Sequence, residues 1–436
     1  MALRVDLQAE QRWTPTHRRT LAVAYDVTSS SPLDLVEAVG GLCDVVWVVE
    51  ASDPSLGSWA RLLPRLGQVI DVGGRSHADV AVDLAAARVD GVVAFTDSQL
   101  YRAALLGEEL GLEGNPPEVV LALTDKVVQR QLLAGAGLPG PRFEQILAGT
   151  TVARARLLVD GLRFPVVVKP QQGSGSRDTF LAEDVHAVGA YLEGVLGGDG
   201  RFDGDVIVEE CLDDITPRPL QAFSDYVSVE AVARHGVIVP LAITGKFPLA
   251  SPFRETGNFL PHHLGADQAT EVVGLAEAGA RALGVNSGAL HIEVKLTPDG
   301  PRLIEVNGRI GGGSIDSLYA SLHGRSLTEI AAAVALGEEV ECGAWETVPT
   351  DGEFVYAYFV QAPVEARVLT GVDRLDRLNA LAGVVATTVN RTVGDRLDWR
   401  DGSQGYLLSV RGSVEGLEEL GRVPERVWSA LELSWR

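Results

Sequence analysis

The acidic and amide side chains in residues 291–313, HIEVKLTPDGPRLIEVNGRIGGG, all stand at odd-numbered positions. This spacing puts them on one face of a β-hairpin, because alternate side chains of a strand share a face. The proline and glycine at 298–300 favour a three-residue turn. With Asp299 at the centre of that turn, Glu293 lies directly opposite Glu305.

Two glutamates that face each other across a sheet repel, so the pair makes chemical sense if a cation lies between them. In the same register His291 lies opposite Asn307. Carboxylate oxygens suit Mg²⁺, which takes one or two carboxylates and completes its shell with water and phosphate oxygens. The sequence therefore favours a magnesium site at Glu293 and Glu305. The alternative is a solvent-facing hairpin with two unrelated glutamates, and for His291 we expect a structural hydrogen bond.

Arg309 continues the alternation of Glu305 and Asn307 and runs into three glycines at 311–313. Glycines let a backbone approach a ligand closely. An arginine beside a magnesium-phosphate site can clamp developing negative charge. These residues extend the predicted site beyond the metal.

Only four of the 37 basic residues are lysines, and all four stand in the middle of the chain: Lys126, Lys169, Lys246 and Lys295. Lysine is a compact point charge, whereas arginine is a planar fork. We interpret this retention of lysine as functional. Chance scatter is the alternative.

The β-branched run 164–170 contains Lys169 near its end and is followed by Gln-Gln-Gly-Ser-Gly-Ser. Backbone N–H groups and hydroxyls of such a loop can bind phosphate oxygens, and the lysine supplies the charge. The sequence is not a P-loop. A flexible surface turn would explain the glycines but not the lysine. Lys126, inside a helix predicted at 118–136, reads by itself as a surface cation.

A short strand at 206–208 leads into Glu209, Glu210, Cys211 and Leu212. Such a backbone edge can pair with a purine, and the glutamates can accept from its amino group or from a ribose hydroxyl. Strands at 226–233 and 237–244 form a second hairpin.

The net charge of −22 argues against a nucleic-acid or anionic-membrane partner. Three widely spaced cysteines form neither a disulfide framework nor a zinc pattern, which favours a reducing, cytoplasmic setting. The N-terminus has no apolar core, so no signal peptide is expected, and no apolar run reaches the ~18 residues of a spanning helix.

Three domains are expected. Residues 1–115 alternate strands and helices in the doubly wound manner, without the G-x-G-x-x-G fingerprint of a dinucleotide site. Residues 116–338 hold the candidate site. Residues 339–436 shift to short strands and look like a separate α+β unit.

Together these motifs resemble those of the ATP-grasp superfamily of ligases. The resemblance implies an α/β pre-grasp domain, an ATP-grasp domain with its glycine loop and hinge near 169–212, and a C-terminal α+β domain. It implies ATP and Mg²⁺, with Mn²⁺ as a substitute, and Glu293, Glu305 and Asn307 as metal ligands. Arg309 and Lys169 become catalytic. The ATP contacts it implies are Lys126, Lys169, Gly173, Ser174, Gly175, Ser176, Glu209, Glu210, Cys211 and Leu212.

Within the superfamily the chain looks most like the L-amino acid ligases that make dipeptides, on the segments 243–247 and 253–257. The resemblance implies a substrate pocket of Glu255, Asn258, Gly312 and Arg309. Asn258 departs from that group, which often has histidine there. Tyr226 stands where the superfamily usually has an acid for the ribose.

The reaction implied is ATP-dependent joining of two amino acids, or of an amino acid and another carboxylate, through an acyl-phosphate, with release of ADP and phosphate. A homodimer is compatible with this group. Two alternatives stay open: an ATP-dependent carboxylase or purine-pathway ligase of the same superfamily, and a nucleotide-binding regulatory module.

Overall fold

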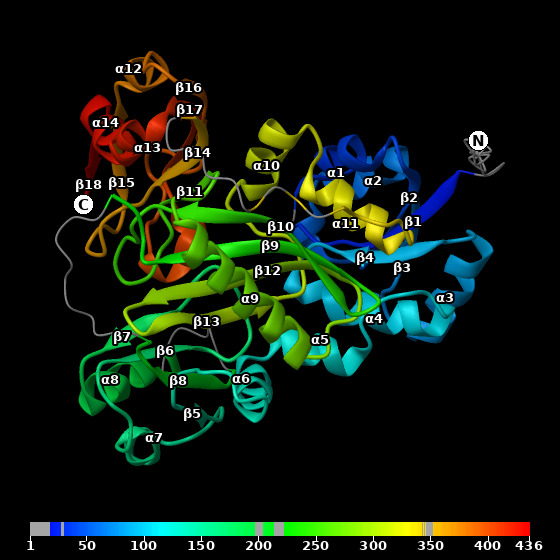
Figure 1. Cartoon of the computed structure of the whole chain (residues 1–436), viewed down its shortest axis with the longest axis horizontal. Coiled ribbons are helices and arrows are strands. Elements are labelled where there is room, and N and C mark those ends of the chain that lie inside the picture. Colours follow the sequence, from blue (N-terminus) through cyan, green and yellow to red (C-terminus); the bar gives the residue numbers. More distant parts are fainter. Residues whose placement is uncertain are drawn as a thin grey trace, which may run out of the picture.

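The computed structural model describes residues 18–27, 30–196, 204–212, 222–341, 343, 345 and 352–436. The N-terminal 17 residues, Cys342 and residues 213–221, which follow the expected hinge, lie outside these ranges. The N-terminal sheet and the C-terminal elements lie on opposite sides of the molecule, and long antiparallel strands run between them (Figure 1). Within the described residues, no helix has the length and apolar character needed to cross a membrane.

The N-terminal region is a parallel sheet of order β3-β2-β1-β4, with helices on both faces, as the sequence predicts. The elements are β1 Arg19–Ala24, α1 Pro32–Val39, β2 Cys43–Val49, the 3-10 helix η1 Pro54–Leu56, α2 Trp59–Leu66, β3 Gln68–Asp71, α3 His77–Ala86, β4 Gly91–Ala94 and α4 Asp97–Leu110.

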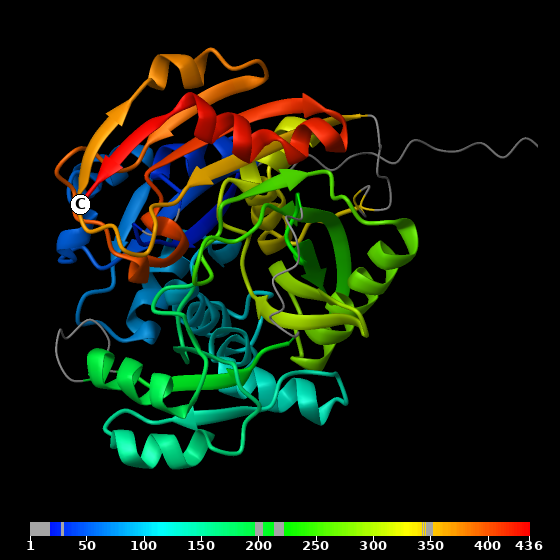
Figure 2. The ribbon, with the colours of Figure 1, turned by 90° about the vertical axis from the view of Figure 1, so that its left-hand side faces the viewer.

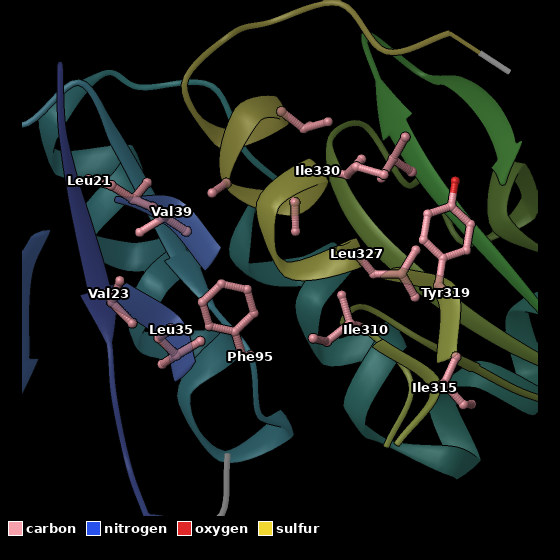
Figure 3. Close-up of a cluster of buried hydrophobic side chains, with 14 of the residues drawn as sticks. Leu21, Val23, Leu35, Val39, Phe95, Ile310, Ile315, Tyr319, Leu327 and Ile330 are labelled. Carbon is pink, nitrogen blue, oxygen red and sulfur yellow. The ribbon is translucent and has the colours of Figure 1, made fainter. Parts of the chain in front are cut away.

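One face of this sheet is shared with a later part of the chain. Helices α10 (Ile315–His323) and α11 (Leu327–Ala335) pack on it together with α1 and α2. Leu21 and Phe95 belong to the same buried cluster as Ile310 and Ile330 (Figure 3). The N-terminal sheet therefore holds the segment that follows the site hairpin. This apolar core therefore extends across the domain boundary proposed at residue 115.

The single helix predicted at 118–136 is instead two helices, α5 (Pro117–Thr124) and α6 (Lys126–Gly135). The backbone at Asp125 is extended, and its carboxylate accepts from the N–H groups of Val127 and Val128 as an N-cap. An aspartate satisfies the free N–H groups of a helix start, which is the physical reason for the break. Lys126 consequently stands at the first turn of α6.

A small antiparallel sheet of order β5-β8-β6-β7 follows, with two helices on one side and a separate apolar core. Its elements are β5 Phe143–Ile146, α7 Val152–Val159, β6 Val166–Pro170, β7 Phe180–Ala182, α8 Val185–Leu196 and β8 Val206–Glu210. Figure 2 shows this unit at the bottom of the molecule, beneath the larger sheet. Lys169 lies on β6, one of its two central strands.

The largest sheet has eight strands in the order β13-β12-β9-β10-β11-β14-β17-β16. Helix α9 (Ala266–Ala282) packs on one of its faces against an apolar cluster that includes Val229, Ile292 and Val306. The strands are β9 Tyr226–Arg234, β10 Val237–Lys246, β11 Gly257–Leu260, β12 Gly288–Thr297, β13 Gly300–Asn307, β14 Glu353–Val360, β16 Val384–Val389 and β17 Leu408–Glu415.

The C-terminal region was expected to be a separate unit. Its strand β14 instead pairs with β11, so β14, β17 and β16 continue the central sheet. The remaining elements surround a buried cluster that also takes in Phe247 and Phe259 from the preceding region. They are β15 Leu369–Asp373, α12 Leu375–Asn379, the 3-10 segment η2 Trp399–Gly405, α13 Gly416–Gly421, α14 Val423–Ala430 and β18 Glu432–Trp435. The domain limits 1–115, 116–338 and 339–436 stay a proposal.

The site hairpin has the predicted pairing but a different turn. Thr297 pairs with Gly300, so the turn has two residues and not three. The register then shifts by one, with Val294 opposite Leu303 and Glu293 opposite Glu305, which makes Ile304 the extra residue of a β-bulge. A shorter turn and a bulge compensate, and the facing glutamates are where the sequence predicts them.

Candidate active site

Five adjacent strands of the large sheet present polar side chains on the face opposite α9. Their cross-strand pairs include His291 with Glu230, Glu293 with Ser228, and Lys246 with Asn258. Several are almost completely buried, which is unusual for polar groups. The polar face comprises Tyr226, Ser228, Glu230, Thr244, Lys246, Asn258, His291, Glu293, Lys295, Glu305 and Asn307.

Glu293 and Glu305 face each other on the two outermost strands of this face, β12 and β13, each beside a cation. The Nζ atom of Lys126 lies 3.2 Å from Oε1 of Glu305, and Nε2 of His291 lies 3.4 Å from Oε1 of Glu293. Burial raises the pKa of Glu293, but the hydrogen bond and charge of His291 outweigh it and lower the pKa to about 2. Glu293 is therefore a carboxylate at neutral pH.

These two carboxylates and the carboxamide of Asn307 form the hard-oxygen set that the sequence predicts for Mg²⁺. Across the part of the chain that the structure describes, no three His, Cys, Asp or Glu side chains are arranged to hold a metal by themselves. A set of two carboxylates leaves most positions for water and phosphate, as magnesium requires. The donor chemistry fits Mg²⁺ held jointly with a nucleotide, and these ligand roles stay predictions.

His291 makes the structural hydrogen bond that the sequence predicts, and its partner is Glu230. Nδ1 of His291 lies 2.9 Å from Oε2 of Glu230, and both side chains are at most 5% exposed. Ser228 and Thr244 donate to the other oxygen of Glu230. Burial lowers the pKa of His291, but the charge of Glu230 raises it to about 9.

Helix α6 holds the outer edge of the hairpin. Gln129 donates to the carbonyl of Val306 and accepts from its N–H, in the manner of a neighbouring strand. Arg130 donates to the carbonyl of Ile304, the bulge residue. Lys126, one turn earlier, lies 2.7 Å from the carbonyl of Gly173. The break at Asp125 thus places Lys126 between the glycine loop and the hairpin. Lys126 is therefore not the free surface cation that its sequence neighbourhood alone suggests.

In the predicted adenine hinge, the side chain of Glu209 has two cationic partners that the sequence did not show. The Glu209 carboxylate is buried and lies 2.8 Å from both Nε of Arg130 and Nζ of Lys169. Burial raises the pKa of Glu209, but these two cations lower it to about 2. Each oxygen of this carboxylate thus has a cationic partner, and the role of residues 209–212 as the adenine hinge stays a prediction.

Of the next two hinge residues, Glu210 is hydrogen-bonded to the protein main chain and Cys211 carries a neutral thiol. Glu210 accepts a 2.8 Å hydrogen bond from the N–H of Arg163. Burial raises the pKa of the Cys211 thiol to about 11, so it is not a nucleophile at neutral pH.

Arg309 has a partner that the sequence did not reveal. Its Nε lies 2.9 Å from Oδ2 of Asp97, the first residue of α4 in the N-terminal region. Burial lowers the pKa of Arg309, but Asp97 and then Glu305 and Glu293 raise it. The signal for Asp97 was its place just after a parallel strand, where such sheets bind ligands.

Two of the three glycines at 311–313 approach protein side chains closely. A Cβ on Gly311 would lie 2.7 Å from Nδ1 of His291, and one on Gly313 would lie 2.4 Å from Nδ2 of Asn258. Asn258 donates to the carbonyl of Gly313, 2.7 Å away. Gly312 alone is exposed, with nothing within 4 Å of its Cβ position. The glycine turn therefore covers the buried end of the polar face and leaves Gly312 open.

Glu255 lies beyond the glycine turn, at the end of the polar face near the C-terminal region. Its Oε1 accepts from Nζ of Lys246 at 3.2 Å and from the hydroxyl of Tyr226 at 3.0 Å. Lys246 is only 1% exposed. The side chain of Tyr226 therefore points into the site, where its hydroxyl donates a hydrogen bond to Glu255.

Residues 173–176 form the loop predicted to bind phosphate. Gly173, Gly175 and Ser176 have positive φ angles of 126°, 68° and 56°. Gly173 and Ser174 are exposed. A cavity of about 520 Å³ opens elsewhere, near the hairpin turn, and none of the predicted site residues lines it.

No family model matches the chain. In sequence it is 28% identical to an alanine–anticapsin ligase of Bacillus subtilis over 230 residues, half of this chain and 48% of the relative. The chain spans 60%, 29% and 48% of the length of three of the curated relatives that it matches.

The fold is that of solved ligases. The structure superimposes on an L-amino acid ligase from Bacillus licheniformis with a TM-score of 0.73 and 19% identity, over 97% of this chain and all of that one. It matches a carboxyaminoimidazole ribonucleotide synthase of Aspergillus clavatus, solved with ATP, with a TM-score of 0.67 and 14% identity over 94% of this chain and 99% of that one.

Proposed function

Because the chain has the ATP-grasp fold and resembles amino acid ligases in sequence, we propose that it is an ATP-dependent ligase that joins a carboxylate to an amine. The observation that carries the proposal is the facing pair Glu293 and Glu305, with Lys126 and His291 beside it. The substrates are two amino acids, or an amino acid and another carboxylate.

Glu293, Glu305 and Asn307 would hold Mg²⁺, or Mn²⁺ in its place. The bound ion would neutralise the phosphates of ATP and so favour in-line attack on the γ-phosphate. Lys126 and Lys169 would bind phosphate oxygens as point charges. Each of these lysines already lies beside a glutamate, which orients its ammonium group.

The substrate carboxylate would attack the γ-phosphorus, giving an acyl-phosphate and ADP. The amine of the second substrate would then attack the acyl carbon, and phosphate would leave as the C–N bond forms. Arg309 would stabilise the oxyanion and the departing phosphate, held in place by Asp97. Residues 173–176 would cover the phosphates and exclude water.

Glu255 would bind the ammonium group of an amino-acid substrate. Its Oε1 is bonded to Lys246 and Tyr226, so Oε2 is the atom offered to the substrate. Asn258 and Gly312 would line the same pocket, Asn258 through the turn that it holds at Gly313.

The test is to incubate the protein with Mg-ATP and pooled amino acids, and to measure phosphate release and new product masses. We expect amino-acid-dependent release of ADP and phosphate together with a condensation product. Arg309→Ala should abolish product formation and leave Mg-ADP binding within about twofold. Arg302→Ala, on the strand β13 that precedes Arg309, is the matched control.

Release of AMP and pyrophosphate would rule out the acyl-phosphate route. ATP turnover that depends on bicarbonate and not on amino acids would favour the carboxylase alternative. Nucleotide binding without turnover under either condition would favour the regulatory module.

A further inference from the structure

The 3-10 segment η2, Trp399–Gly405, lies between two parts of the candidate site that are far apart in sequence. On one side it contacts the glycine loop. The N–H of Ser403 donates to the carbonyl of Gly175 at 2.8 Å, and the N–H of Asp178 donates to the carbonyl of Arg400 at 3.1 Å. Two main-chain hydrogen bonds therefore join the C-terminal region to the predicted phosphate loop and to Asp178 just after it.

Gly402 makes this contact close. Its φ of +67° favours glycine, and a Cβ there would lie 2.2 Å from the carbonyl oxygen of Gly175 and 2.7 Å from the N of Arg177. These neighbours are backbone atoms, which cannot swing away as a side chain would. The segment and the glycine loop thus pack backbone to backbone.

On its other side the segment holds the main chain of Glu255. The N–H of Glu255 donates to Oγ of Ser403 at 3.0 Å. Nε2 of Gln361 donates both to the carbonyl of Glu255 at 2.8 Å and to the carbonyl of Ser403 at 2.9 Å. Both backbone groups of Glu255 are bonded to C-terminal residues that are at most 9% exposed.

A third contact anchors the start of the segment. Trp399 packs against the core of the small sheet, with its ring 6.3 Å from that of Phe180. Residues 399–403 therefore connect the small sheet, the glycine loop and the Glu255 loop. A displacement of Ser403 would therefore disturb hydrogen bonds to both the glycine loop and the main chain of Glu255.

We propose that Ser403 is a positioning residue that holds the glycine loop and the substrate pocket at Glu255 in a fixed relation to each other. In this way the C-terminal segment couples the binding of nucleotide to the binding of the amine substrate. Its N–H holds the carbonyl of Gly175 in the loop, and its hydroxyl accepts from the N–H of Glu255. The coupling of the two binding events rests on the proposed function. The junction, meaning the hydrogen bonds that Ser403 makes to Gly175 and Glu255, does not, and the two are tested separately.

Two neighbouring substitutions separate the sides of the junction. Ser403→Ala removes the bond to Glu255 and keeps the N–H that reaches Gly175. Gly402→Ala drives the segment and the loop apart. The matched controls are Ser429→Ala, which removes a hydroxyl bond on α14, and Gly394→Ala, at a glycine with φ +102° and open space around it.

Hydrogen–deuterium exchange of the full chain, without substrates, tests the junction. In Ser403→Ala the Glu255 amide should exchange about fivefold faster, the loss expected for one hydrogen bond, while residues 175–178 stay unchanged. In Gly402→Ala exchange should rise both at 175–178 and at Glu255. Unchanged exchange at Glu255 in both variants, relative to the controls, would overturn the proposal.

Steady-state kinetics test the coupling. Ser403→Ala should raise KM for the amine about fivefold, with kcat and KM for ATP within twofold. Gly402→Ala should raise KM for both. A Gly402→Ala protein in which only KM for ATP changes would overturn the coupling. Absence of ligase turnover in the unmodified protein would overturn the proposed function, whereas the exchange result would still stand.

Discussion

The buried pair of His291 and Glu230 should make the stability of the protein fall between pH 6.5 and 9. In the folded chain the pKa of His291 is raised to about 9 from the ordinary 6.5, because the charge of Glu230 outweighs the effect of burial. Below pH 6.5 the imidazole is protonated in both the folded and unfolded chains, so the full stabilisation is present. Between pH 6.5 and 9 the unfolded chain loses its proton and the folded chain keeps it, so unfolding becomes easier as pH rises.

The size of the effect follows from the shift. Each pKa unit corresponds to about 1.4 kcal/mol, so the shift of about 2.5 units amounts to about 3.4 kcal/mol in all, of which about 3 kcal/mol is lost between pH 6 and 9. The pKa values of His262, His263 and His323 are lowered, so their contributions fall below pH 6.5, outside the window.

The assay is urea unfolding at pH 6, 7, 8 and 9, in the absence of nucleotide and metal, on the unmodified protein and on His291→Gln. Glutamine keeps a hydrogen-bond donor for Glu230 but does not titrate. We expect the unmodified protein to lose about 3 kcal/mol more than His291→Gln between pH 6 and 9. Parallel pH profiles for the two proteins would refute the assignment of the charge to His291.

Three further substitutions test other contacts. Asp97→Asn should lower kcat while leaving KM for ATP within twofold, because Arg309 loses its charged partner. The same substitution should destabilise the fold by about 2 kcal/mol in urea unfolding. An unchanged kcat would contradict the positioning of Arg309 by Asp97. Gly313→Ala should destabilise by more than about 1 kcal/mol because a Cβ meets a buried amide, whereas Gly312→Ala should change stability by less than about 0.5 kcal/mol; equal effects would disprove the packing argument. Lys126→Met should weaken Mg-ADP binding about tenfold in calorimetry, and unaltered binding would remove this lysine from the nucleotide site.

The sequence predicted the fold where the pattern was local and periodic. The buried strands of the N-terminal sheet and the facing glutamates follow from alternation and turn chemistry. The pairing of Glu293 with Glu305 was correct although the turn was not, because a shorter turn and an extra residue cancel. The break at Asp125 was missed because good helix formers surround it, and the capping side chain prevailed over propensity.

Contacts between distant segments could not be read from the sequence. Arg309 and Asp97 are 212 residues apart, and Ser403 and Glu255 are 148 apart. Nothing local in the sequence shows that the Glu209 carboxylate is paired with Arg130 and Lys169. The β11–β14 pairing, which makes the C-terminal strands part of the central sheet, is likewise a long-range choice.

The bulge at Ile304 separates the geometry of the site from that of the hairpin tip. Leu303 belongs to the apolar core, whereas Glu305, two positions later, faces the site, which strict alternation would forbid. The carbonyl of Ile304 is bonded to Arg130, so the switch of face is fixed from outside the hairpin. The exposed residues Pro298 and Asp299 can therefore be exchanged for a longer connection or a fluorescent label without changing which way the glutamates point, which makes the tip a place to attach a reporter.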